Sequence, residues 1–466
     1  MRGIMLGVVF FGALPFVFRR PFVGVLLWFW MSIMNPHRIV YGLFSELPYA
    51  LIIGVVTLLA WVTSREAKRP PIDTTTVLLF CLLIWITITS VFGLAPGADI
   101  YDRWQLAAKM LGFTLLAYSM MTTRVRVEAV VWIVALSIGF YGLRGAIFTL
   151  LHGGGDRIWG PPESMIADNN ELGVALNMAL PLLIFGFERV ADRRLRVAML
   201  CVAAATFLST IFTYSRGAFL TISAVAAILW LKSRHKLIIA FATVVAAVLI
   251  WNFAPQQWSA RMSTIQTYQK DQSAESRLYF WRLATAMAEH RPLVGGGFHW
   301  NRYPAIVNSE LADSGLPALT RPRATHSIYF EMLGNHGFIG LGLFVSLILV
   351  TFLNARWTAK YTAHSPELAW ANSLGRMLQL SLLAYCIGGA FVSLGMYDGF
   401  YVLAIVAAAT RRVVLTEINA DPSVVGRLPR ASELAESSVY ATTDPPVTLA
   451  RSKLVRAHEQ FRRATE

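Results

Sequence analysis

The sequence predicts an all-α, polytopic membrane protein, and three observations lead to this prediction. Hydrophobic residues make up 56% of the 466 residues, charged residues make up only 15%, and the mean hydropathy is +0.53. In a soluble domain about a quarter of the residues would be charged. Apolar segments near or above the roughly 17–20 residues of a membrane-spanning helix also recur along the chain.

These apolar segments give 12 or 13 expected transmembrane helices, because the first two are short and could form one broken or tilted hairpin. The first segment ends in Arg19-Arg20 without a small-residue cleavage site, so we expect no cleaved signal peptide. The candidate helices cover residues 4–18, 22–34, 48–63, 75–94, 104–121, 128–151, 171–187, 195–213, 216–232, 236–253, 326–353, 374–395 and 398–411.

Basic residues gather in every second loop, and the positive-inside rule makes those loops cytoplasmic. The basic loops contain Arg19-Arg20, Arg65 to Arg69, Arg124 with Arg126, Arg189 to Arg196, Lys232 to Lys236, and Arg356 to Lys360. The loops expected in the periplasm are 35–47, 95–103, 152–170, 213–216, 254–325 and 396–397. Most of the formal net charge of +14 is therefore a topology signal, and no nucleic-acid partner is expected.

A long polar interruption divides the chain into four expected regions. Residues 1–253 form the N-terminal transmembrane helices, residues 254–325 a periplasmic loop domain, and residues 326–412 the C-terminal transmembrane helices. Residues 413–466 are polar, mixed in charge and interrupted by proline, so we expect a largely disordered cytoplasmic tail with a short helix near its end, over 447–464.

Within the large loop, apolar residues at helical spacing predict two short amphipathic helices. The two patterns comprise Trp258, Met262, Ile265 and Tyr268, and Leu278, Trp281, Ala284 and Ala288. The second pattern stops before Pro292 and the run Gly295-Gly296-Gly297. A loop of this length with its own helices is more often functional than a spacer, so we place the candidate site here.

Arg216 opens the apolar segment 216–232, and Ser215 stands where it can cap the helix. The first-turn amides and the positive helix end favour an anion there, and a guanidinium adds a bidentate fork suited to phosphate. An arginine that merely reaches the membrane interface is the alternative, but such residues are expected mainly on the cytoplasmic side. We therefore predict that Arg216 binds an anionic, lipid-linked substrate.

Arg277 and Trp281 are four residues apart, which makes them neighbours on one helix face. An arginine beside an aromatic ring suits a sugar-phosphate ligand, whereas a solvated helix is the alternative for any single arginine of the loop. Taken together, these arginines give a basic surface that the positive-inside rule does not explain. They are Arg261, Arg277, Arg282, Arg291, Arg302, Arg321 and Arg323.

His326 lies where the loop returns to the membrane, and a histidine there can act as a general base near neutral pH. His290 and His299 are its rivals within the loop, and a simple role at the helix start is the alternative. Asn169 and Asn170 open another segment on the same side and could bind sugar hydroxyls or cap the helix.

Tyr214 precedes Arg216 in the same turn. Gly296 belongs to a glycine run that lets the backbone approach a ligand closely, although no Walker pattern follows it. No Asp-x-Asp pattern is present, so arginine must supply the countercharge to a pyrophosphate. The three cysteines, Cys81, Cys201 and Cys386, have neither disulfide nor zinc spacing, and we expect no metal and no cofactor.

Several motifs of the later part of the chain form a set. They are Ser-Arg-Gly-Ala at 215–218, Ser-Arg-x-x-x-Trp at 276–281, the glycine-rich turn, His326-Ser327-Ile328-Tyr329, and Gly337-Phe338-Ile339-Gly340. With the many spans and one large late loop, this set resembles the O-antigen ligase and polymerase superfamily over roughly residues 165–400. The nearest variant is the group of O-glycosylation ligases found with exosortase systems, which has Pro-Asn at the position of Asn169-Asn170 and His-Asn at that of His326-Ser327.

The resemblance implies a GT-C-like, inverting, metal-independent glycosyltransferase of the bacterial inner membrane, with its active site facing the periplasm. As an O-antigen ligase it would move a glycan from undecaprenyl pyrophosphate to lipid A–core, surrounded by membrane lipids. The same resemblance implies that Arg216 and Arg277 bind the pyrophosphate and that His326 activates the acceptor hydroxyl or orders the site.

Other functions stay open at this point. An O-antigen or exopolysaccharide polymerase, or a protein O-oligosaccharyltransferase, would use the same donor with a different acceptor. A polysaccharide transporter or flippase would show charged residues in mid-membrane and broken helices in corresponding halves. The polarity here is concentrated in one external loop, which favours an enzyme over a transporter.

Overall fold

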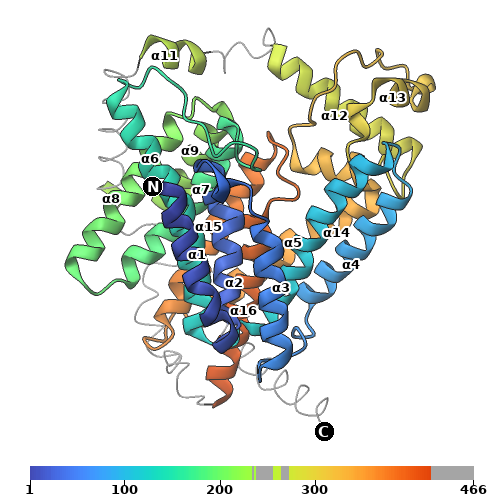
Figure 1. The fold of residues 1–466 in the computed structure, drawn as a ribbon. Helices are drawn as coiled ribbons and strands as arrows, with labels where there is room; N and C mark the ends of the chain where they lie inside the picture. The colour runs from blue at the N-terminus through green and yellow to red at the C-terminus, as the bar shows by residue number, and fades with distance from the viewer. Residues whose placement is uncertain (233–235, 238–254, 264–271, 421–466) are drawn as a thin grey trace, which may run out of the picture.

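The computed structural model describes residues 1–232, 236–237, 255–263 and 272–420, and every regular element within these ranges is helical (Figure 1). This confirms the predicted all-α class. The elements of the N-terminal half are α1 (Arg2–Arg19), α2 (Phe22–Phe29), the π-helical turn η1 (Trp30–Met34), the 3-10 turns η2 (Pro36–Ile39) and η3 (Leu43–Ser45), α3 (Tyr49–Thr63), α4 (Thr74–Val91), α5 (Gly97–Met120), α6 (Arg124–Leu151), α7 (Asn169–Arg189), α8 (Arg193–Ile211) and α9 (Arg216–Lys232).

The later elements combine short external helices with three long ones. They are α11 (Gln256–Ser263), α12 (Gln272–His290), the 3-10 turn η5 (Trp300–Arg302), α13 (Pro304–Glu310), the 3-10 turn η6 (Ala312–Ser314), α14 (Ile328–Tyr361), α15 (Ala369–Gly389) and α16 (Asp398–Ala420).

Every predicted span within the described residues falls on a helix, while most of the predicted span 236–253 lies outside them. In the described part of the chain, seven helices are long and apolar enough to cross a membrane, namely α1, α4, α6, α7, α8, α14 and α16. Three further apolar segments are shorter: Phe22–Met34, Tyr49–Thr63 and Arg216–Leu231. The protein is therefore a polytopic membrane protein, and its remaining predicted spans fall on shorter or more polar helices.

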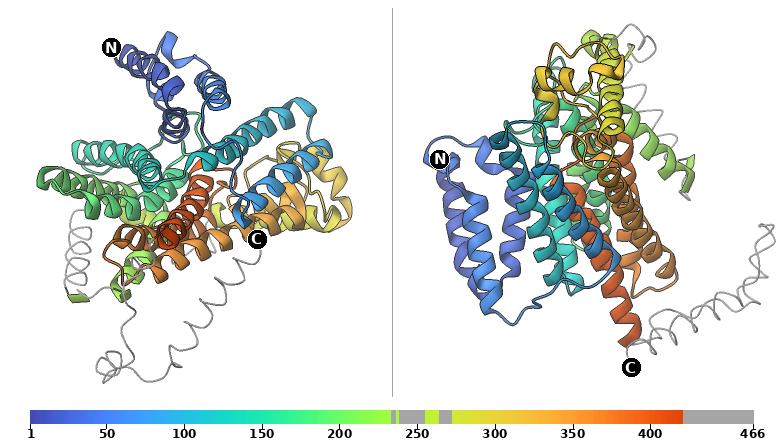
Figure 2. Two further views of the ribbon diagram at one scale, coloured as in Figure 1. Left: turned by 90° about the horizontal axis from the view of Figure 1, so that it is seen from below. Right: turned by 90° about the vertical axis from the view of Figure 1, so that its right-hand side faces the viewer.

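The centre of the bundle is formed by α7, α15 and α16, while α1, α2 and α3 stand at one edge (Figure 2). Small residues let neighbouring helices approach closely, as is usual between membrane helices. A β-carbon added to Gly142 of α6 would lie 2.2 Å from Thr206 Oγ1 of α8. One added to Gly173 of α7 would lie 2.5 Å from Ala218 Cβ of α9, so both crossings require glycine.

A sharp kink divides α14 at Gly337, whose backbone has φ 67° and ψ −169°. The run at Gly295–Gly297 docks into this kink: the amide of Gly296 donates to the carbonyl of Gly334 over 2.8 Å, and that of Gly297 donates to Asn335 over 2.9 Å. The carbonyl of Gly296 accepts from the Leu94 amide at 2.9 Å. The close backbone approach expected for a ligand is thus made with another part of the chain, and we do not propose Gly296 as a binding residue.

The described helices between α9 and α14 lie at one end of the bundle, where Figure 1 shows α11 on one side and α12 and α13 on the other. The two helices predicted for the large loop correspond to α11 and α12, although the positions of Ile265 and Tyr268 lie outside the described residues. Proline at the first position of α13 fits that helix start. A separate apolar cluster joins α12, η5 and α13 into one external unit, comprising Phe280, Leu283, Ala284, Met287, Trp300, Val307, Leu311 and Leu319.

The last helix is longer than expected, because α16 continues past the predicted boundary at Arg412 to Ala420. Val413 and Val414 are buried on one face of this extension. Arg412 donates to the carbonyl of Met121 over 2.7 Å, which ties the helix to the end of α5. The rest of the predicted tail, 421–466, lies outside the described residues.

Candidate functional site

The starts of α7 and α9 lie against each other. The side-chain amide of Asn169, the first residue of α7, donates to the carbonyl of Thr213 over 2.6 Å, and Asn169 is only 4% exposed. Further along, Gly173 packs on Ala218. The positive ends of two helices therefore meet at one place.

Arg216 is the first residue of α9 and is half-buried. Ser215 Oγ accepts from the amide of Ala218 at 3.2 Å, which confirms Ser215 as the helix cap. The buried side chain of Ser215 thus fixes the helix start, and with it the point from which the Arg216 side chain leaves the backbone.

The connection between α15 and α16 links the starts of α9 and α14. A β-carbon on Gly217 would lie 3.5 Å from Phe391 Cβ, and two residues further on Ser393 Oγ accepts from the amide of His326 at 3.0 Å. Gly217, which follows Arg216, and His326 therefore both contact the same short segment, although 109 positions separate them in the sequence.

His326 is not the cap of α14. The helix begins at Ile328, and Ser327 occupies the cap position with an extended backbone. His326 stands one residue earlier with φ 48°, in the left-handed region that costs a residue with a side chain about 1–3 kcal/mol. The bond to Ser393 helps to hold this conformation, as does a bond of 3.0 Å from Trp281 Nε1 to the carbonyl of Thr325.

Charged groups on two other elements act on the His326 imidazole. Burial and the neighbouring Arg277 lower the pKa of His326 below its ordinary value of 6.5; the Asp168 carboxylate opposes them, and Arg323 adds to the lowering. At neutral pH the imidazole is therefore uncharged and able to accept a proton. Arg277 of α12 and Asp168 at the start of α7 both lie close enough to affect it.

Trp281 connects α12 to the start of α14. Its ring stacks on that of Phe330 with a centroid distance of 5.0 Å and an interplanar angle of 10°. The stack lines a cavity of about 410 Å³, together with Arg282 and Leu316. Because the indole N–H is bonded to Thr325, Trp281 positions the backbone beside His326.

Two family models match the chain. Residues 200–345 match the O-antigen ligase family, and residues 1–185 match a family of unknown function (DUF5935). The match over residues 200–345 supports the resemblance to the O-antigen ligase and polymerase superfamily. No curated protein matches it.

The family match supports, in general terms, glycosyltransferase-type activity on a lipid-linked glycan in a multi-pass membrane protein. The segment that matches the O-antigen ligase family contains Arg216, Arg277 and His326. Asp168 and Asn169 lie in the other matched segment. The helix junction described above therefore draws residues from both matched segments.

Asn169 and Asn170, the two predicted polar residues at the start of α7, have hydrogen-bond partners within the protein. Asp168 caps α7, accepting at 2.9 Å from the amide of Asn170 and at 2.7 Å from its side chain. Asn169 is buried against Thr213. The two asparagines thus shape the start of α7, where the sequence left capping and sugar binding open.

His299 lies with a different set of charged residues from that of His326. It also has a left-handed backbone, with φ 61°, and its Nδ1 is buried. Burial, followed by Arg302 and Arg103, lowers the pKa of His299 to about 4, while Asp99 opposes them. His299 thus lies near charged residues of α5, Asp99 and Arg103, and not among the groups around His326.

Sequence reasoning missed two residues that the structure places beside His326. Asp168 stands next to the asparagines at the start of a span. No local sequence pattern indicates that it lies close to a histidine 158 positions later. Ser393 lies in a connection of small and polar residues between two apolar helices. That composition indicates a turn and gives no indication of a partner for His326.

Proposed function

We propose that the protein is an O-antigen ligase, which transfers a glycan from undecaprenyl pyrophosphate to lipid A–core on the periplasmic face of the inner membrane. The observation that carries the proposal is the position of His326, uncharged and held beside Arg277 and Asp168 at a junction of helix starts. This arrangement pairs a proton acceptor with positive charge, as transfer from a pyrophosphate requires.

The pyrophosphate is proposed to bind at Arg216 and Arg277. The starts of α7, α9 and α14 direct their positive ends to this side of the bundle, which favours an anion. Each guanidinium offers a planar pair of donors that matches phosphate oxygens. Together they supply positive charge where the leaving group gains negative charge.

In the proposed reaction, a hydroxyl of the acceptor attacks the anomeric carbon of the glycan from the side opposite the pyrophosphate. The bond from that carbon to the pyrophosphate oxygen breaks, and the electron pair leaves with the pyrophosphate, so the anomeric configuration inverts. His326 takes the proton of the hydroxyl as the new bond forms. Arg216 and Arg277 stabilise the departing anion electrostatically.

The experiment that tests this function is glycan transfer by the purified full-length protein in a lipid bilayer. The reaction would contain an undecaprenyl-pyrophosphate-linked glycan and lipid A–core, and products would be separated by mass. Glycan attached to lipid A–core is the expected result. Elongation of the lipid-linked glycan would instead identify a polymerase, and glycan on a protein acceptor would identify an O-oligosaccharyltransferase.

A further inference from the structure

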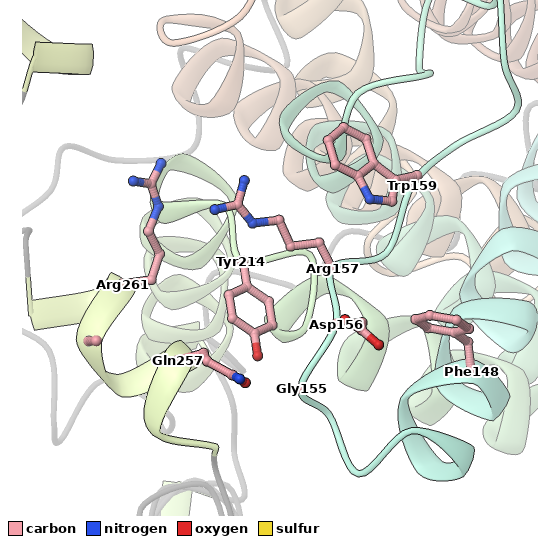
Figure 3. A pocket seen from close by; sticks show the side chains of 9 residues that line it. Phe148, Gly155, Asp156, Arg157, Trp159, Tyr214, Gln257 and Arg261 are labelled. Carbon is pink, nitrogen blue, oxygen red and sulfur yellow. The ribbon is translucent and has the colours of Figure 1, made fainter.

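A cavity of about 790 Å³ lies beside the turn that precedes Arg216 (Figure 3). Its walls are built by the end of α6 with the connection from α6 to α7, by Tyr214 in the turn between α8 and α9, and by α11. Its size is within the range of small-molecule sites, which is roughly 300–1,000 Å³. None of the residues proposed for the transfer step lines it.

The walls are fixed by contacts between the segments. Tyr214 has a left-handed backbone, with φ 60°, and its hydroxyl donates to the carbonyl of Gly154 over 2.6 Å. On the opposite wall, Trp258 of α11 donates from Nε1 to the carbonyl of Ile211 at the end of α8, over 3.1 Å. The cavity is therefore formed before any ligand arrives.

The lining suits a sugar ring. Trp159 is 55% exposed in the connection from α6 to α7, so its indole face is free to stack on the C–H face of a pyranose. The indole face carries negative charge density, which attracts the weakly positive C–H bonds. Asp156 accepts hydrogen bonds from hydroxyls, and Gln257 both donates and accepts them.

Two arginines make the cavity selective for charge. Figure 3 shows the guanidinium groups of Arg157 and Arg261 on the same side of the cavity, next to the ring of Tyr214. With Asp156 as the one carboxylate of the lining, the charged side chains sum to +1. A guanidinium binds a carboxylate through two parallel hydrogen bonds, so a ligand with one acidic group complements this lining.

We propose that this cavity binds an acidic sugar unit of the glycan that the protein transfers. The inference rests on the proposed function, and it specifies the substrate class. Tyr214 and Arg216 belong to the same turn, so a donor with its pyrophosphate at Arg216 has its sugars within reach of the cavity. A phospholipid phosphate would also meet the arginines, but it would offer Trp159 no sugar face to stack on.

Trigalacturonate and its methyl ester provide a matched pair of soluble probes with the same sugar rings, in which esterification removes the negative charge and adds a methyl group to each carboxyl group. Their binding would be measured by ligand-observed NMR with the purified full-length protein in detergent micelles, without lipid-linked donor. The acidic form should bind at least about tenfold more tightly than the ester, as expected for a charge-assisted contact. Arg157→Gln should abolish this preference, and Trp159→Ala should weaken both forms. Arg321→Gln, on an exposed arginine outside the cavity, should behave as wild type.

Equal binding of the acid and the ester by the wild-type protein, or an unchanged preference in Arg157→Gln, would overturn the proposal. Displacement of trigalacturonate by an equal concentration of glycerol 1-phosphate would assign the cavity to lipid headgroups and overturn it as well. The proposed function is judged separately by the transfer assay. A protein that binds the uronate but transfers nothing to lipid A–core contradicts the ligase assignment only, and a ligase that does not bind the uronate contradicts this inference only.

Discussion

Trp281 and Thr325 are joined by a hydrogen bond of 3.0 Å from the indole N–H to the backbone carbonyl. Thr325 precedes His326, and the amide of His326 is in turn bonded to Ser393 Oγ at 3.0 Å. The backbone at Thr325 and His326 is thus held by a hydrogen bond from α12 on one side and by one from the α15–α16 connection on the other. The position of the imidazole therefore depends on the external unit being docked.

Trp281→Phe should lower the rate of transfer while donor affinity stays unchanged. The phenyl ring can still stack on Phe330, but the bond to Thr325 is lost, at a cost of about 0.5–1.5 kcal/mol. A small displacement of a catalytic group is enough to slow a reaction about tenfold or more. Single-turnover rates and donor affinity would be measured beside Tyr279→Phe, which removes a comparable bond to Pro317 from the same helix. Equal rates in the two variants would contradict the positioning role.

His326→Ala should fold, insert and bind donor, but transfer glycan at least about 100-fold more slowly, because general base assistance contributes roughly 10²–10⁴-fold. His326→Asn provides a control for the backbone, because asparagine tolerates the left-handed conformation found here. Both variants should be slow in a single-turnover assay. A near-normal rate in His326→Asn, with only a loss of thermal stability in His326→Ala, would assign His326 to structure.

Arg216→Lys should bind the donor about 10–100-fold more weakly than wild type, because the ammonium keeps the charge but loses the bidentate fork. Arg216→Ala should be weaker still. Binding of a lipid-linked donor would be measured at equal protein levels, with Arg321→Lys as the control on the external surface. Wild-type affinity in Arg216→Ala would exclude this arginine from the donor site.

The pH dependence of transfer should respond in opposite directions to two substitutions. Only the uncharged imidazole accepts a proton, so the rate should fall as the pH decreases through the pKa of His326, which lies below 6.5. Arg323→Gln removes a charge that lowers this pKa, so the acidic limb should move to higher pH. Asp168→Asn removes a charge that raises it, so the limb should move to lower pH. Single-turnover rates across the acidic range measure both, and shifts of the same sign would refute the assignment of the base.

The external unit should face the periplasm. A cysteine placed at the exposed Ser309 of α13 should react with a membrane-impermeant thiol reagent in cells whose outer membrane has been permeabilised. A cysteine at the exposed Ala191, in the loop between α7 and α8, should react only after the inner membrane is lysed. The reverse pattern would invert the topology derived from the positive-inside rule.

The helices could be predicted from the sequence because hydropathy is a local property of the chain. The same argument failed at α16, whose end is polar on one face while Val413 and Val414 are buried on the other. A strict apolar run ends at such a point, although the helix continues. The helix α16 therefore extends beyond the predicted span, which ended at residue 411.

Much of the candidate site depends on contacts between distant segments, which local patterns do not contain. Charge and aromatic spacing were sufficient to single out Arg277 and Trp281. The role of the indole followed only from the bond to Thr325, 44 positions away. Gly296 shows the same difficulty, since a glycine run indicates that something approaches the backbone closely but does not say what. Here it is α14.

The docking of the glycine run at Gly337 has a mechanical consequence. The bonds to Gly334 and Asn335 lie before the kink of α14, and a bond of 2.9 Å from the amide of Phe338 to the carbonyl of Pro292 lies after it. Because hydrogen bonds hold the kink on both sides, it is a rigid bend and not a hinge. The external unit is thus fixed to α14 on both sides of the kink. A displacement of that unit would therefore also displace α14 on both sides of its kink.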